Sequence, residues 1–113
     1  NDEGYVMTER LQYVYTLSAV NPEKAASRDA WTDEDRETFN LHWANLERLK
    51  VDGSLILAGR ALDPDGSGPA IVVIEADTEA HAQRIFLAEP FVVRGFATAT
   101  LHPFRVAISR YEE

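Results

Sequence analysis

Three stretches of the chain show the hydrophobic patterns of β-strands. From residue 11 to residue 17, bulky apolar side chains occupy every second position, which is typical of a strand with one face in a core. The short apolar segment 54–60 lies between Gly53 and a turn-rich stretch, so it predicts a second strand that enters a hairpin loop. The nearly continuous apolar run 70–76 predicts a third, central strand that is covered on both faces.

A fourth strand is predicted close to the end of the sequence. Threonine and alanine alternate from residue 96 to residue 101, and apolar residues alternate with polar or small ones over residues 104–109. Pro103 interrupts this pattern. Because proline has no N–H to donate to a ladder, it marks an edge position, a bulge or a break in the strand.

The segment between the first two strands carries the pattern of a helix that runs from Thr32 to Gly53, after a loop or short helical turn over residues 18–31. Thr32 is a suitable N-cap, and Gly53 suits the left-handed conformation that closes a helix. We expect Trp43 to pack at the boundary of the core, where its replacement by alanine costs the roughly 3–5 kcal/mol typical of a buried aromatic residue. The inward face recurs at three- and four-residue steps and comprises Phe39, His42, Trp43, Leu46 and Leu49.

A second helix is predicted from residue 78 to about residue 87, with Asp77 as its cap. Pro90 disfavours a helical conformation at the residue before it, so this helix ends ahead of Glu89. The residues expected to face inward are Ala82, Ile85 and Phe86.

The predicted order, β-α-β-β-α-β, is the split unit of the ferredoxin-like fold, an α+β architecture with a four-stranded antiparallel sheet and two helices on one face. The 113 residues suit a flexible N-terminal segment, 1–10, and a single domain, 11–110. The other face of the sheet must also be buried, so we expect two sheets to pack face to face in a homodimer, a dimeric α/β barrel. The residues that the helices of one chain cannot all cover are Tyr13, Tyr15, Ile71 and Val73.

Composition excludes several classes of function. The chain has no cysteine, which removes thiol nucleophiles, thiolate metal sites and disulfides. Its net charge of −8 would repel the phosphates of a nucleic acid, and its apolar runs are far too short to cross a bilayer. Neither a calcium loop nor a helical histidine pair is present, so no metal is expected. We expect a soluble, cytoplasmic protein that binds neither nucleic acid nor membrane.

Two residues are candidates for chemistry. His42 lies on the apolar face of the first helix, where it is either a core histidine bonded to a backbone carbonyl or a catalytic base. Pro90 fixes Glu89 at a helix exit, where its carboxylate is either aimed inward or solvated. Gly59 and Gly95 mark close approach of backbone or ligand, with use in a turn or bulge as the stronger interpretation.

Four short motifs occur in order along most of the chain: HWANL at 42–46, the segment 53–59, AEPFVVRG at 88–95 and HPF at 102–104. Together they resemble the YciI-like, or YCII-related, family. The resemblance implies a ferredoxin-like dimeric barrel in which a helix-borne histidine lies beside the aspartate of an Asp-Pro-Tyr or Asp-Pro-Phe motif. His42 matches the histidine. Glu89 stands where the family usually has aspartate, one methylene longer with the same charge.

The resemblance implies an enzyme that uses His42 and Glu89 for proton transfer or elimination on a small organic molecule, with no cofactor. A carboxylate beside an imidazole fixes its tautomer and stabilises its charged form. Two alternatives are a small-ligand-binding or interaction module, in which the pair only holds the core together, and a cofactor-independent oxygenase of aromatic compounds. A polar cavity at His42 would favour an enzyme over a core role. The residues assigned to the substrate pocket are Tyr13, Gly59, Phe91 and Gly95.

Overall fold

The structure is a computed structural model that describes residues 10–110. The predicted flexible segment 1–10 lies outside the described residues except for Arg10, the first residue of the described part.

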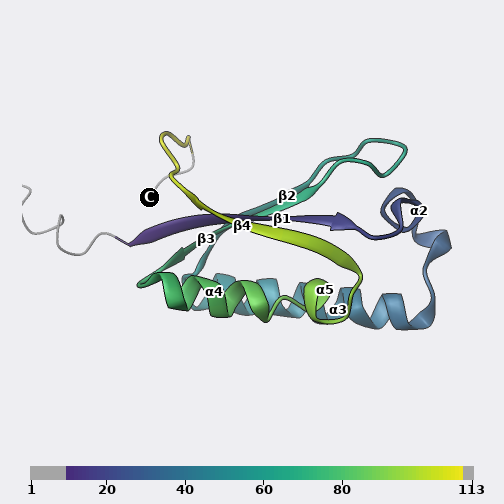
Figure 1. Ribbon diagram of the computed structural model, residues 1–113, viewed down its shortest axis with the longest axis horizontal. Coiled ribbons are helices and arrows are strands. Elements are labelled where there is room, and N and C mark those ends of the chain that lie inside the picture. The colour runs from purple at the N-terminus through teal and green to yellow at the C-terminus, as the bar shows by residue number, and fades with distance from the viewer. Residues whose placement is uncertain (1–9, 111–113) are drawn as a thin grey trace, which may run out of the picture.

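Four antiparallel strands form one sheet in the order β2-β3-β1-β4, which confirms the predicted ferredoxin-like arrangement (Figure 1). Pro103 pairs with Tyr13 on the edge strand β4, where its missing N–H faces no neighbouring strand. The last strand ends at Phe104, earlier than its alternating pattern predicted. The strands are β1 (Leu11–Ala19), β2 (Leu55–Arg60), β3 (Ala70–Ala76) and β4 (Ala97–Phe104).

The main helices cover one face of the sheet (Figure 1). Thr32 caps the long helix through a reciprocal hydrogen-bonded box with Asp35, as its sequence position suggested. The next helix is capped by Thr78 and not by Asp77, because the Thr78 hydroxyl accepts from the N–H of His81. The helices are α2 (Pro22–Ala26), η1 (Arg28–Ala30), α3 (Asp33–Val51), α4 (Glu79–Leu87) and α5 (Pro90–Val93).

A β-bulge in β2 sets which of its side chains face the helices. Leu55 pairs with Ile74 and Leu57 pairs with Val73, so Ile56 is an extra residue on this strand. An inserted residue reverses the alternation of every residue after it. Arg60, which lies opposite Ala70, therefore belongs to the helix-covered face of the sheet.

The core lies between the sheet and the helices. The predicted alternation of β1 is confirmed, because Tyr13, Tyr15 and Leu17 are buried on its inner side. The expectation for Trp43 is wrong. Its side chain is 55% exposed and stacks on Phe39 at 6.1 Å between ring centroids, because the buried line of α3 passes through the residues Thr38, His42, Asn45, Leu46 and Leu49.

Fewer apolar residues are exposed on the sheet face away from the helices than the sequence analysis expects. Tyr13 and Tyr15 face the helices, and Val73 is buried within one chain although it lies on the outer face. Among the four residues expected to need a partner, Ile71 alone is exposed, at 37%, and its neighbour Leu57 is 48% exposed.

Candidate active site

Glu89 precedes the short helix α5 and serves as its N-cap. Its backbone is extended, with φ −61° and ψ 121°, and its side chain accepts a hydrogen bond from the N–H of Phe91 at 3.1 Å. Pro90 occupies the first helical position, where a fixed φ suits a helix start and no N–H is needed. The same proline keeps Glu89 out of the helical conformation, as predicted.

The Glu89 carboxylate is 0% exposed, and three donors surround it. Besides the N–H of Phe91, the hydroxyl of Tyr15 donates to Oε1 at 2.8 Å, and Nδ1 of His42 lies 2.5 Å from Oε2. Burial of an ionised carboxylate is costly unless its oxygens are hydrogen-bonded or paired. Both oxygens of Glu89 meet that condition.

Tyr15 completes this buried cluster from the central strand β1. Its ring meets Phe86 edge-on at 5.6 Å between centroids. Burial, followed by the charge of Glu89, raises the pKa of the Tyr15 hydroxyl far above its ordinary value, so the hydroxyl stays protonated and donates. The sequence placed Tyr15 on the inner face of its strand but gave no signal of this role, because the hydrogen bond joins residues 74 positions apart.

His42 presents one ring nitrogen to Glu89 and the other to open space. Its ring is 8% exposed and stacks on Phe91 at 4.0 Å, with 10° between the planes. Because a carboxylate can only accept, Nδ1 carries a proton in this contact, and in the neutral imidazole the lone pair is then on Nε2. Within residues 10–110 no hydrogen bond engages Nε2, and that atom is not among the buried unpartnered ones, so it remains accessible.

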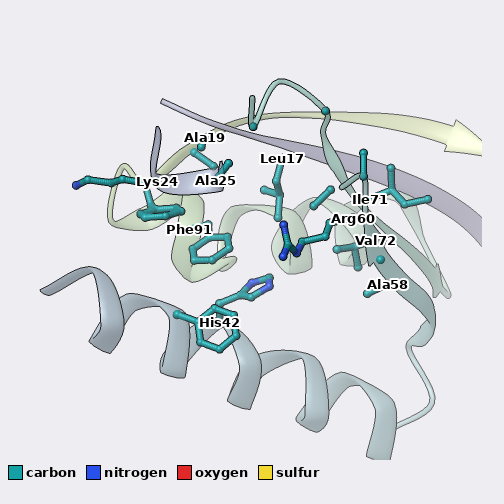
Figure 2. A pocket seen from close by; sticks show the side chains of 18 of the residues that line it. Leu17, Ala19, Lys24, Ala25, His42, Ala58, Arg60, Ile71, Val72 and Phe91 are labelled. Carbon is teal, nitrogen blue, oxygen red and sulfur yellow. The ribbon is translucent and has the colours of Figure 1, made fainter. Parts of the chain in front are cut away.

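A cavity of about 340 Å³ adjoins His42 between α3 and the sheet (Figure 2). Its volume is at the lower end of the roughly 300–1,000 Å³ of ligand pockets, which suits a small molecule. Aromatic side chains from α3, α5 and two connecting segments line it. They are Trp31, Phe39, Trp43, Phe91 and Phe96.

The structure brings two of the four predicted pocket residues, Gly59 and Phe91, to the cavity wall. Tyr13 and Gly95 are not among the residues that line this cavity. Tyr13 packs in the core. Gly95, with φ 74°, closes α5, since the N–H of Phe96 bonds to the Phe91 carbonyl at 2.9 Å across it. Arg28 and Arg60 also line the cavity, although no pattern in the sequence marked them as pocket residues.

The other two histidines lie away from this site. His81 is half-buried on α4, and His102 is exposed on β4, where its Nε2 lies 3.1 Å from the Thr100 hydroxyl. Across residues 10–110, no three His, Cys, Asp or Glu side chains are grouped so that they could hold a metal ion. In the same part of the chain, every helix is too short or too polar to cross a membrane.

The sheet order and its helical cover define an α+β protein with the ferredoxin-like arrangement. The model of the YCII-related domain family matches residues 13–105, and the chain belongs to that family. No curated protein matches the sequence significantly.

Two solved structures are similar to this chain. One is 5-chloro-2-hydroxyhydroquinone dehydrochlorinase (TftG) from Burkholderia phenoliruptrix AC1100, in complex with 2,5-dihydroxybenzoquinone, with a TM-score of 0.56 and 16% identity over 82% of this chain and 93% of that chain. The other is a variant of SnoaB, a cofactor-independent oxygenase from Streptomyces nogalater, with a TM-score of 0.48 and 12% identity over 91% of this chain and 98% of that chain. At 16% identity, the first similarity shows a shared fold and no shared activity. The second structure is too distant for any conclusion.

Proposed function

We propose that this protein is an enzyme that catalyses proton transfer, or elimination begun by proton transfer, on a small organic molecule. His42 acts as the general base through Nε2, and Glu89 orients the imidazole and stabilises the charge it acquires. The observation that carries the proposal is the 2.5 Å contact between His42 Nδ1 and Glu89 Oε2 at the wall of an accessible cavity. A pair that only held the core together would need no cavity beside the histidine.

The substrate bond suited to this arrangement is a C–H bond acidified by a neighbouring carbonyl or ring. Nε2 of His42 takes the proton, and the electron pair of the C–H bond moves into the carbonyl or ring. Where the adjacent carbon carries a leaving group, that pair instead forms a double bond and the leaving group departs. Where it does not, the proton returns at another carbon and gives an isomer. The hydrogen bond to Glu89 strengthens as the imidazole becomes charged, and none of these steps needs a cofactor.

Dehydrochlorination, the reaction in the name of the similar Burkholderia enzyme, is an elimination and falls in the same class. That likeness agrees with the proposal, which rests on the geometry of His42 and Glu89. The alternative of a non-catalytic binding module predicts that a small molecule binds in the cavity without losing a proton. Oxygenation of aromatic compounds has no support from this site beyond the shared fold.

The test is hydrogen exchange into candidate small molecules in D₂O, followed by NMR. A molecule with an acidified C–H should gain deuterium in the presence of the wild-type protein. The His42→Gln variant should lose about a hundredfold or more of that exchange rate, the scale of general-base catalysis. The control is His102→Gln, because His102 is exposed and does not line the cavity.

Full exchange activity in a folded His42→Gln variant would contradict the proposal. So would a molecule with an acidified C–H that binds in the cavity and exchanges no proton, since that is the behaviour of a binding module. Equal losses in the His42 and His102 variants would point to a general effect on the fold and would also count against His42 as the base.

We further propose that the protein acts as a homodimer through the sheet face away from the helices. Leu57 and Ile71 are exposed there, and burial of such side chains against a second copy is favourable. Sedimentation velocity at micromolar concentration should show a dimer, and Leu57→Lys should convert it to a monomer. A wild-type monomer under these conditions would contradict the proposal.

A further inference from the structure

The charged side chains that line the cavity are positive, although the net charge of the whole chain is negative. The sequence carries 19 acidic and 11 basic residues, yet the lining includes Lys24, Arg28 and Arg60 and no aspartate or glutamate. Lys24 is already compensated, because its Nζ lies 2.7 Å from Oδ2 of Asp35. A cleft lined by charges of one sign concentrates ions of the other sign. This cavity therefore favours an anion.

The two arginines keep their charge available. Arg28 lies over the rings of Trp31 and Phe39, at 5.0 Å and 4.7 Å from their centroids, which holds its guanidinium without neutralising it. Within residues 10–110, no carboxylate oxygen lies within 4.0 Å of Arg28 or Arg60. A guanidinium offers paired N–H donors that match the two oxygens of a carboxylate.

The bulge in β2 turns the side chain of Arg60 toward the part of the cavity that His42 lines. In a regular strand with no bulge after Leu55, Arg60 would face away from the helices. Figure 2 shows its side chain extending into the cavity from the sheet, while His42 enters from α3. A molecule that spans the cavity can thus contact both side chains.

We infer that the substrate of the acid–base reaction proposed above is a small, planar carboxylate whose anionic group is bound by Arg60. The planar shape fits the aromatic side chains that line the cavity, among them Trp31, Phe39 and Phe96, because aromatic rings pack well against flat molecules. Arg28 adds positive potential that draws the anion in. The inference rests on the proposed function, because it names the class of molecule on which His42 acts.

Binding of benzoate and of its neutral analogue benzamide, measured by NMR titration, tests the inference without any need for turnover. Benzoate should bind the wild-type protein about tenfold or more tightly than benzamide, and the difference should shrink as salt is added. Arg60→Gln should remove the preference, and Arg60→Lys should keep part of it, since lysine retains the charge and loses the paired donors. Arg84→Gln is the matched control, because Arg84 is exposed on α4 and does not line the cavity.

Equal affinity for benzoate and benzamide in the wild-type protein, or an unchanged preference in folded Arg60→Gln, would overturn the inference. Absence of benzoate binding at millimolar concentration would also overturn it. Preference that depends on Arg60, together with no proton exchange in any bound carboxylate, would support the anion site and count against the proposed function. Proton exchange that depends on His42 but occurs only in neutral molecules would support the proposed function and refute the inference that the substrate is a carboxylate.

Discussion

The buried cluster of Tyr15, Glu89 and His42 differs from the two cavity arginines in how its charges are satisfied. Both oxygens of Glu89 have donors within 3.1 Å, and the carboxylate has no contact with solvent. Arg28 and Arg60 have no carboxylate partner within residues 10–110. The Glu89 carboxylate has all its hydrogen-bond donors within the chain, whereas the charges of the two arginines are available to a ligand.

In the proposed function, this contrast corresponds to a division between the residues for catalysis and the residues for substrate binding. A general base must be held in one orientation and one tautomer, and a buried, fully hydrogen-bonded carboxylate does that without a ligand. A binding group must be free until the ligand arrives, and a guanidinium over aromatic rings at the cavity wall meets that need. Changes to the buried cluster should therefore alter rate and stability, and changes to the arginines should alter affinity.

The largest expected effect comes from Glu89→Gln. The amide N–H₂ can donate to Nδ1 of His42, which would move the imidazole proton to Nε2 and remove the lone pair from the cavity. We expect the fold to persist and the rate of proton exchange to fall by about a hundredfold to ten-thousandfold. The exchange assay in D₂O measures this, and a variant that keeps more than half of the wild-type rate would break the contrast.

Tyr15→Phe should have the next largest effect. It removes one donor from a carboxylate that stays buried, so the free energy of unfolding should fall by about 1–3 kcal/mol. Tyr13→Phe is the matched control on the same strand face, and its effect should stay within about 0.5 kcal/mol, because no hydrogen bond of the Tyr13 hydroxyl is formed within residues 10–110. Urea denaturation compares the two, and equal losses would refute the role of Tyr15.

Trp43→Ala should cost only about 1 kcal/mol of stability, the scale of one partly exposed aromatic contact. Its side chain is 55% exposed, whereas Leu49 on the same helix is buried. Leu49→Ala should cost the about 2–5 kcal/mol of a core truncation. A similar cost for both substitutions, measured by urea denaturation, would mean that Trp43 is covered in solution, for example by a second copy of the chain.

Asp35→Asn should have the smallest effect, and one that depends on pH. The hydrogen bond from Lys24, followed by that from the N–H of Thr32, holds the pKa of the Asp35 carboxyl below its usual 3.8. Its contribution to stability is therefore present above pH 3.8 and is lost as the pH falls through the lower folded value. Thermal unfolding should show a shallower decline in acid for Asp35→Asn than for the wild type, and parallel curves would contradict this.

Much of the fold follows from local patterns in the sequence. The alternation of β1, the apolar run of β3 and the cap at Thr32 each depend on residues close together in the chain, and the structure confirms all three. The Glu89-Pro90 pair is a local signal too, since the proline fixes where the helix starts. His42 could be chosen because an imidazole on an apolar helix face needs a partner.

The residues that escaped prediction depend on contacts between distant parts of the chain. Arg60 faces the cavity because of a bulge at Ile56. The position of a bulge cannot be recognised within a continuous apolar segment of the sequence. Tyr15 is one of two tyrosines on the inner face of β1, and no local pattern distinguishes it from Tyr13 before the fold brings Glu89 to it. The prediction for Trp43 is wrong because the apolar positions of a helix indicate which side faces the core but not how far around the helix the buried surface extends.

The most direct test of the account is the tautomer of His42, read from ¹⁵N chemical shifts of the imidazole in labelled protein at neutral pH. We predict a proton on Nδ1 in the wild type, where Glu89 accepts it, and a proton on Nε2 in Glu89→Gln. His102, which has no carboxylate partner within residues 10–110, should give the same spectrum in both proteins. A wild-type His42 with its proton on Nε2, or one that does not respond to Glu89→Gln, would contradict the account.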